Sequence, residues 1–436
     1  MDKVKINSYK LLLFLVIIFS PSFFYFSKNI SNIVFINFSL LLLIVTFKKE
    51  IINLKISKNF LIGLIFILIQ MIPINSFFLE IISPKSNYYY SLLSEEGFRF
   101  ISLNPLLTLK FLIIYSSCYL IYLITPMLIK NKRELKKVLQ IIIFFGFIHA
   151  SYGLVMNTLN LNDYYFYKKI SNFNSVSGFF INRNHFAFLI LIIFITSLTL
   201  IQLNQKYFNK VSFKSVSFFL SDNFIIRVII LLFALALILT KSRTGNFSFV
   251  SLIVILIIYE WIKNRKLNLL IVILLSIIIL DFLIITFIFG IDGVATRFVE
   301  TSIESERRFP VFHFGINQIL NFPIFGYGLG NFETIYRLEI QDNQFFYDHT
   351  HNDFIEYAGE IGLIGFFIFG IFFYKFIKKV LQKNILNEIK YLIFSLLILI
   401  FIHGNLDFAL HMPQIIYIVT FIFSLAECKI KKTNSN

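Results

Sequence analysis

Charged residues are scarce in this chain: Asp, Glu, Lys and Arg together make up only 15% of its 436 residues. Hydrophobic residues make up 57%, and the mean hydropathy is +0.79. Because apolar runs recur along the whole length, this composition excludes a protein with one soluble core. It predicts an all-α, polytopic membrane protein, in which backbone polar groups within the bilayer are satisfied inside helices.

Cysteine is almost absent as well. Cys118 and Cys428 are far apart in the sequence, which argues against a disulfide, and they match no metal-ligand spacing. The sequence also shows no internal repeat, no low-complexity tract and no soluble domain. We therefore predict a single integral membrane domain over residues 1–436.

Apolar runs of about 20 residues are long enough to cross about 30 Å of hydrocarbon, and they recur down the chain. They predict about 12 transmembrane helices, near residues 8–26, 30–47, 59–79, 105–129, 138–157, 184–203, 223–240, 244–262, 267–289, 353–377, 388–404 and 412–427. The longest connection, residues 290–352, is a large loop between the predicted helices nine and ten.

Lysine and arginine are unevenly divided between the two sides of this topology. With the N-terminus in the cytoplasm, 27 of the 40 basic residues fall on the cytoplasmic side and 13 on the outer side. This asymmetry predicts that both termini are cytoplasmic and that the loop 290–352 is outside. The net charge of +16 is then a consequence of topology and does not indicate a nucleic-acid partner.

Polar motifs are concentrated on the outer side. They are GFFINRNHFA (178–187), TKSRTGNF (240–247), ESERRFPVF (304–312), NFPIFGYGLGNFE (321–333), DHTHNDFIEYAGEIGLIGF (348–366) and HGNLDFALHMP (403–413). Six of the seven histidines lie on that side, whereas the cytoplasmic connections are lysine-rich. An active site, if there is one, is predicted to face outward.

Arginines on the outer side oppose the usual distribution of basic residues and need a separate explanation. Arg243 can snorkel to lipid headgroups, and Arg183, Arg307 and Arg308 can form ordinary surface ion pairs. Together, however, they offer the fork-shaped donors that bind phosphate or diphosphate oxygens. The predicted ligand is therefore anionic.

The segment 348–366 places acids where the predicted tenth helix begins. Asp353 followed by Glu356 is typical of a helix-capping box. Asp353, Glu356 and Glu360 share one helix face, and Glu360 lies about 10 Å along the helix at about 1.5 Å per residue. Because a carboxylate at that depth is costly without a partner, we expect an arginine or a hydroxyl group beside Glu360.

Two histidines precede this helix. His349, His351 and Asp353 form a His-x-His-x-Asp pattern that can ligate a metal, but no third ligand follows at a defined spacing. We favour a histidine that titrates near the working pH above an arginine-lined cleft. The same cleft is expected to include His403, Asp407 and His411, at the outer edge of the last two predicted helices.

The motifs have a characteristic spacing and order. His351 and Asn352 are followed by nine residues, Gly362, two residues and Gly365. The segments at 178–187, 240–247, 304–312 and 321–333 precede them, with the large outer loop in between. This ordered set resembles the O-antigen ligase and Wzy-type polymerase superfamily. The resemblance covers residues 178–413 by motif, as an O-antigen ligase-like catalytic region, and the first five spans by topology alone.

The resemblance implies transfer of a glycan from a polyprenyl diphosphate carrier to an acceptor hydroxyl on the periplasmic face of the bacterial inner membrane. It implies His351 as the catalytic residue, and Arg243 with Arg307 or Arg308 as diphosphate ligands. The supporting residues expected around them are Arg183, His185, His349, Asn352, Asp353 and Glu360. The implied partners are the carrier-linked donor, a glycan or lipid A–core acceptor and membrane lipids, with no nucleic acid.

No metal and no cofactor is expected for this reaction. A diphosphate is already a good leaving group, so the protein has to orient the acceptor, assist its deprotonation and neutralise the departing charge. Arginines can neutralise that charge without a metal. No Asp-x-Asp pair that would argue for one is presented on the outer side.

The acceptor is left open by the sequence. A ligase transfers the glycan to lipid A–core, a polymerase to another carrier-linked repeat, and a protein glycosyltransferase to a side chain. We favour a ligase, because the His-Asn-x9-Gly-x2-Gly spacing fits that pattern fully. A lipid-linked glycan transporter is an alternative of a different class, but it needs polar groups near the bilayer midplane, whereas these motifs cluster on one side.

Overall fold

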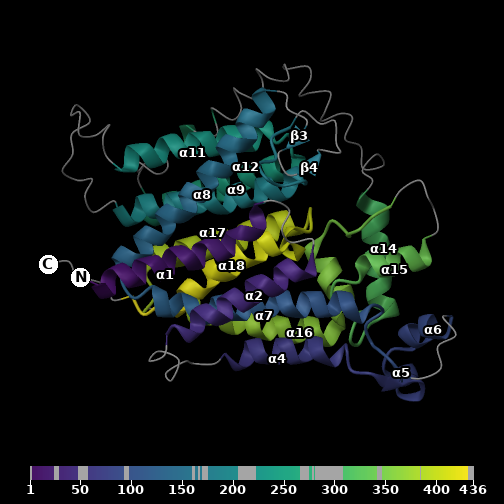
Figure 1. The fold of residues 1–436 in the computed structure, drawn as a ribbon. Coiled ribbons are helices and arrows are strands. Elements are labelled where there is room, and N and C mark those ends of the chain that lie inside the picture. Colours follow the sequence, from purple (N-terminus) through teal and green to yellow (C-terminus); the bar gives the residue numbers. More distant parts are fainter. Residues whose placement is uncertain are drawn as a thin grey trace, which may run out of the picture.

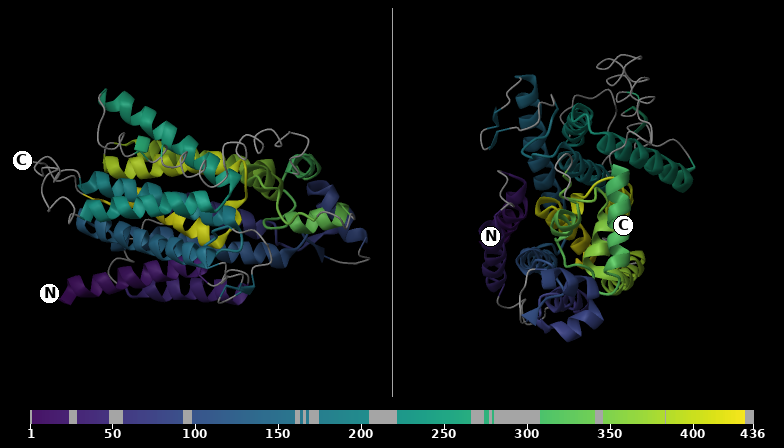
Figure 2. Two further views of the ribbon diagram at one scale, coloured as in Figure 1. Left: turned by 90° about the horizontal axis from the view of Figure 1, so that it is seen from above. Right: turned by 90° about the vertical axis from the view of Figure 1, so that its right-hand side faces the viewer.

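The computed structural model describes a helical bundle with short elements gathered at one end (Figure 1). The described residues are 2–23, 29–47, 57–92, 98–159, 163–164, 167–168, 175–204, 222–265, 274–276, 279, 308–340, 346–382 and 384–430. In the left view of Figure 2 the long helices run side by side, and α1 begins at the end of the bundle opposite the short elements.

Helices account for nearly all of the regular structure. The α-helices are α1 (Asp2–Phe19), α2 (Ile30–Val45), α4 (Lys58–Ile69), α5 (Ser76–Ile82), α6 (Pro84–Leu92), α7 (Pro105–Leu128), α8 (Lys132–Thr158), α9 (Arg183–Asn204), α11 (Asp222–Leu239), α12 (Arg243–Asn264), α14 (Arg308–Asn321), α15 (Phe332–Glu339), α16 (Asp353–Leu381), α17 (Asn387–Gly404) and α18 (Pro413–Ser424). Short 3-10 helices are η1 (Ser20–Ser22), η4 (Ala409–His411) and η5 (Leu425–Glu427).

Strands are short and lie outside the bundle. β1 (Ile74–Asn75) pairs antiparallel with β2 (Phe98–Arg99), with Ile74 opposite Arg99. β3 (Asp163–Tyr164) pairs antiparallel with β4 (Tyr167–Lys168). Two-residue strands of this kind fix turns and do not form a core.

Six of the described helices are long and apolar enough to cross a membrane: α7, α8, α9, α12, α16 and α17. Five shorter apolar helices accompany them, over Asn7–Ser22, Ile30–Val45, Lys58–Ile69, Phe224–Leu239 and Pro413–Glu427. The prediction of a mostly helical, multi-pass membrane protein is therefore confirmed, while the count of about 12 spans stays a prediction. The predicted ninth span, 267–289, lies mostly outside the described residues, as does much of the predicted loop 290–352.

The prediction of a span over residues 59–79 is wrong in its second half. α4 ends at Ile69, and the chain turns before it forms β1. Pro73 explains the ending, since proline has no amide hydrogen for a helix and disfavours helical geometry in the residue before it. Gln70 follows the last residue of α4, and its side chain contacts the backbone of α16.

α16 is broken at Gly362, where φ is 62° and ψ is −179°. The segment 323–328 lies alongside the break and pairs with it through the backbone. The amides of Tyr327 and Gly328 donate to the carbonyls of Gly359 and Glu360, both at 3.1 Å, and the amide of Leu363 donates to the carbonyl of Pro323 at 2.8 Å. Gln70 also donates to the carbonyl of Glu360, at 2.8 Å. Protein groups therefore satisfy the backbone that the break releases.

α9 lies in the middle of the bundle and α16 at its outside. In α9, 94% of the membrane-length window is buried, against 17% in α16. α9 packs against α8, α11, α12 and α17, and its side chains from Phe186 to Ile195 are apolar on all sides. The buried helix therefore holds the bundle together, while most of the membrane-length window of α16 is not buried against other helices.

Replacing Gly362 by alanine is expected to destabilise the protein. A Cβ atom there would lie 2.5 Å from the amide nitrogen of Gly326, and the backbone conformation is one that L-residues rarely adopt. We expect a loss of about 1–3 kcal/mol, measured by thermal unfolding in detergent. Gly370→Ala in the same helix is the control, because its Cβ would meet nothing within 4 Å. Equal melting temperatures for the two variants would contradict this account of the break.

Candidate active site

Asn352 fixes the start of α16. Its side-chain carbonyl accepts hydrogen bonds from the amides of Phe354 at 3.0 Å and Ile355 at 3.1 Å, which makes it the N-cap. The predicted capping box of Asp353 and Glu356 is therefore wrong, because both acids lie inside the helix. Their side chains are 1% and 0% exposed and are used for contacts with other segments.

Glu356 reaches back to the residues before the helix. Its carboxylate accepts hydrogen bonds from the amide of Thr350 at 2.8 Å and from its hydroxyl at 3.0 Å, and it lies 2.6 Å from Nδ1 of His349. Burial alone would lower the pKa of His349, but the charge of Glu356 and its hydrogen bond outweigh burial and raise that pKa. The cationic form of His349 is thereby favoured.

His411 lies among three buried carboxylates. Its Nδ1 is 2.8 Å from Oδ1 of Asp353, and its Nε2 is 3.2 Å from Oε2 of Glu360 and 3.5 Å from Oε1 of Glu356. The prediction that the three acids share one helix face is confirmed. The prediction of an arginine or hydroxyl partner for Glu360 is wrong, because His411 at the end of η4 is its partner.

The same contacts govern the protonation of His411. Burial would lower its pKa, but the charges of Glu356 and Glu360 raise it well above the usual value. Both ring nitrogens of His411 face carboxylate oxygens, as in a doubly protonated imidazole. A buried imidazolium therefore offsets part of the negative charge of the three acids.

Donor atoms of Glu356, Glu360 and His411 lie within 4.8 Å of one another, which makes them a possible set of metal ligands. Hydrogen bonds from a protonated His411 account for the same arrangement. The His-x-His-x-Asp pattern does not converge on one point, because His349 pairs with Glu356, His351 with Asp407 and Asp353 with His411. A site without a metal stays our prediction.

Asp407 lies in the turn between α17 and η4, and His351 lies beside it. Nδ1 of His351 is 3.3 Å from Oδ1 of Asp407; the histidine side chain is 22% exposed and that of the aspartate is fully buried. Burial would raise the pKa of Asp407, but the hydrogen bond with His351 and nearby histidines lower it. An ionised Asp407 favours the tautomer of His351 that carries its proton on Nδ1, and in that tautomer Nε2 is the acceptor.

The backbone of His351 is also unusual. Its φ is 56°, in the left-handed region that residues other than glycine seldom occupy. Such strain is concentrated at functional sites, where the surrounding structure maintains it. Here the neighbouring hydrogen bonds of Thr350 and Asn352 supply that support.

Phe408 brings three of the predicted site histidines together. The ring of His349 stacks on it with centroids 3.9 Å apart, while His351 and His185 meet it edge-on at 5.1 Å and 4.7 Å. Phe408 is not among the site residues predicted from the sequence. Its only signal was its position in the polar motif 403–413.

Arg308 connects this cluster to α12. Its Nη1 donates to the carbonyl of Leu406 at 2.9 Å and to the hydroxyl of Thr244 at 3.1 Å. Thr244 follows Arg243, whose side chain is exposed at the start of α12. Arg308 therefore contacts both the residue after Arg243 and the residue before Asp407. Arg307 lies outside the described residues.

The start of α9 joins the same region. The hydroxyl of Ser242 donates to Oδ1 of Asn184 at 2.7 Å, which ties Asn184 to the residue before Arg243. Arg183 and His185 flank Asn184; Arg183 is half-buried and His185 is 5% exposed. The predicted site residues that the structure describes thus gather around the starts of α9, α12 and α16.

The expectation that His403, Asp407 and His411 line an open cleft is wrong. Their exposed fractions are 0%, 0% and 2%. His403 packs against Phe188 with ring centroids 4.5 Å apart. These residues lie behind the surface and act through their contacts with other side chains.

Residues 228–370 match the family model described as O-antigen ligase (Wzy_C). The match confirms the resemblance that the sequence motifs indicate. It includes Arg243, Arg308 and His351, and it ends within α16. A comparison with curated proteins finds no match.

Loss of the charge on His349 should weaken the protein in a pH-dependent way. A raised pKa in the folded state means that the His349–Glu356 pair stabilises the protein fully below about pH 6.5, and that this contribution is lost as the pH rises through the raised pKa. His349→Gln should therefore melt about 2–4 °C below wild type at pH 6, with a smaller difference at pH 9. Melting curves in detergent across this range are the test; a constant difference would indicate a neutral His349.

Proposed function

Because residues 228–370 match the O-antigen ligase family model, we propose that this chain transfers a glycan from a polyprenyl diphosphate carrier to an acceptor hydroxyl. The reaction occurs on the periplasmic face of a bacterial inner membrane, within the catalytic region 178–413. Both termini are cytoplasmic and the loop 290–352 is periplasmic. Lipid A–core is the favoured acceptor, which makes the protein a ligase.

One observation carries the proposal: contacts of Arg308 connect the residue after Arg243 to the residue before Asp407, and Asp407 contacts His351. Arg243 precedes Thr244, Thr244 accepts from Arg308, and Arg308 donates to the carbonyl of the residue before Asp407. Asp407 in turn contacts His351. Donors for an anionic leaving group therefore lie beside a base, which is the combination that glycan transfer requires.

His351 acts as the base in this scheme. Its Nε2 takes the proton of the acceptor hydroxyl while the oxygen attacks the anomeric carbon. The bond between that carbon and the diphosphate oxygen breaks, and the electron pair leaves with the polyprenyl diphosphate. Asp407 positions the imidazole and stabilises the imidazolium that forms.

Arg243 and Arg308 neutralise the diphosphate. Arg308 is held by its contacts with Leu406 and Thr244, so it is preorganised for this role. The exposed Arg243 at the start of α12 is placed to close on the diphosphate when the donor arrives. Neither step requires a metal or a cofactor.

The orientation of α1 is consistent with this scheme. α1 begins at the end of the bundle opposite α14 and α15, whereas α16 begins beside α14 (Figure 1). A cytoplasmic N-terminus therefore puts His351 on the periplasmic side.

The break in α16 supports a second candidate, a lipid-linked glycan transporter, because broken helices are common at transporter binding sites. In this protein, however, backbone groups and Gln70 satisfy the break. A polymerase with the same donor chemistry also stays an alternative to the ligase. Expression in ligase-deficient and polymerase-deficient bacteria, followed by examination of the lipopolysaccharide ladder, separates these candidates.

His351→Ala should abolish transfer while the protein still inserts and accumulates. A lost acid–base group lowers the rate on the order of 10²–10⁴-fold, so activity near background is expected. The measurement is glycan transfer by purified enzyme with a carrier-linked donor. His349→Ala is the matched comparison and should be milder, since His349 pairs with Glu356 and lies off the chain of contacts.

A metal mechanism gives a different pattern in the same assay. A metal held by His349 and His351 predicts equal loss in both variants and sensitivity to EDTA. Observing both would overturn the assignment of His351 as a metal-independent base.

Arg243→Lys should lose at least about tenfold in transfer although the charge is kept. A point-like ammonium cannot reproduce the two-pronged contact of a guanidinium with a diphosphate. Arg337→Lys is the control, because Arg337 is exposed on α15 and pairs with Glu333 at 2.8 Å. Normal transfer by the Arg243 variant would mean that this residue only anchors the helix at the membrane surface.

A further inference from the structure

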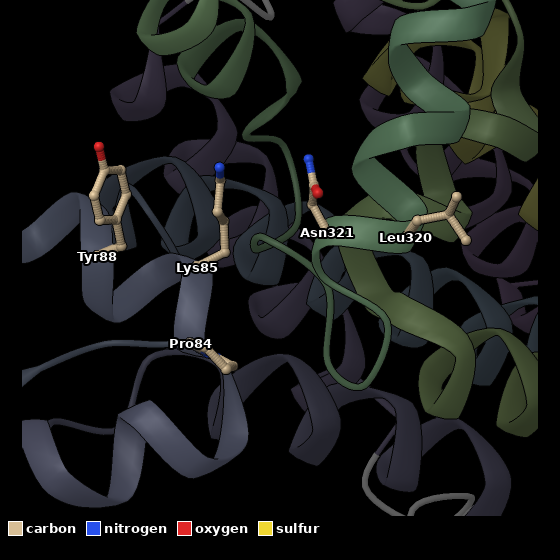
Figure 3. A pocket seen from close by; sticks show the side chains of 5 residues that line it. All are labelled: Pro84, Lys85, Tyr88, Leu320 and Asn321. Atoms are coloured by element: carbon tan, nitrogen blue, oxygen red, sulfur yellow. The ribbon is translucent and has the colours of Figure 1, made fainter.

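A pocket of about 480 Å³ lies between α6 and the end of α14. Pro84, Lys85, Tyr88, Leu320 and Asn321 line it, and none of the described residues assigned above to transfer does so. Figure 3 shows that the side chains of Tyr88, Lys85 and Asn321 extend from the two elements in the same direction. The volume is within the range of about 300–1,000 Å³ that is typical of small-molecule sites.

Glu339, at the end of α15, organises the polar wall of this pocket. Its Oε1 accepts a hydrogen bond from the hydroxyl of Tyr89 at 2.5 Å and lies 3.8 Å from Nζ of Lys85. Its Oε2 accepts from Gln318 at 2.7 Å. Gln318 is 1% exposed, and its Oε1 accepts a hydrogen bond from the side-chain amide of Asn321 at 3.1 Å. The polar groups of the pocket are therefore held in place from three different helices.

The charge balance of the pocket disfavours an anionic ligand. The positive charge of Lys85 is offset by Glu339, so a phosphate would gain little attraction there. Burial, together with the hydrogen bond and charge of Glu339, also raises the pKa of Tyr89 and keeps it neutral. A neutral ligand with several hydroxyl groups suits these donors and acceptors better.

The apolar wall fits the same kind of ligand. Tyr88 is 52% exposed and Leu320 is 73% exposed, and Pro84 beside them is exposed as well. A sugar ring has a face of C–H groups that packs on an aromatic ring, and hydroxyl groups at its edge that bind amides and ammonium groups. The pocket combines both kinds of surface.

The position of the pocket relates it to the transfer site. A Cβ atom on Gly315 of α14 would lie 2.7 Å from Ile355 and 3.0 Å from Thr350, so α14 touches the residues around His351. Asn321 follows Gly315 by six residues, which is about 9 Å along the helix at about 1.5 Å per residue. A short oligosaccharide can extend over this distance.

We propose that this pocket is a carbohydrate subsite that holds a sugar unit of the glycan chain, away from the bond that is formed. That this sugar belongs to the transferred glycan or to the acceptor glycan rests on the proposed function. Such a subsite adds binding energy equally to the ground state and the transition state, so it lowers KM for long chains and leaves kcat unchanged.

Direct binding tests the subsite without relying on transfer. The probe is the free glycan, released by mild acid from the lipopolysaccharide of a strain that carries the gene, and the readout is saturation-transfer NMR with purified protein in detergent. Tyr88→Ala should weaken binding about three- to tenfold, whereas Tyr88→Phe keeps the ring and should bind like wild type. Asn321→Ala provides a second variant if Tyr88→Ala does not fold.

The outcomes separate this inference from the proposed function. The subsite is overturned if wild type does not bind the glycan. It is also overturned if wild type binds and both Tyr88→Ala and Asn321→Ala bind equally well. Displacement of the glycan by inorganic phosphate at equal concentration would show an anion site and also overturn it. His351→Ala should bind the free glycan normally, so a failure of the transfer assay leaves the result for the subsite intact.

Discussion

Three carboxylates on the first turns of α16 are buried, and the architecture of the site depends on how their charge is offset. A buried carboxylate without a cationic or hydrogen-bonding partner is costly enough to prevent folding or to become protonated. His411 lies within 3.5 Å of all three acids, and His349 lies 2.6 Å from Glu356. His349 lies in the segment 346–352 and His411 in the segment 405–411. Because both histidines contact the carboxylates of α16, the two segments pack against each other.

The geometry proposed for catalysis follows from that packing. Once the two segments are together, Asp407 lies beside His351 and Phe408 packs among the histidines. Arg308 then reaches the carbonyl of Leu406 and links the pair to the start of α12. The left-handed backbone of His351 is maintained by the hydrogen bonds of Thr350 and Asn352 on either side of it, which explains how a strained conformation persists at the surface of the cluster.

The helices and the neighbourhood of the site were predictable from the sequence, because apolar length and motif order are local signals. The partners were not. Glu360 and His411 are 51 positions apart, and His351 and Asp407 are 56 apart, so no short pattern identifies either pair. Gly362 is visible in the motif, but the sequence does not show why a glycine is needed there. The backbone of the segment 323–328 approaches position 362 too closely for a side chain. Such contacts depend on the complete fold.

The central claim is that Asp407 makes His351 a base for glycan transfer, and Asp407→Asn tests it most directly. The amide keeps the shape of the side chain but removes the charge that stabilises the imidazolium. With insertion and melting temperature matched to wild type, we expect transfer to fall on the order of 10²-fold or more. Asp348→Asn, which alters an exposed carboxylate in the segment before α16, should transfer normally. Wild-type transfer by Asp407→Asn would contradict the account.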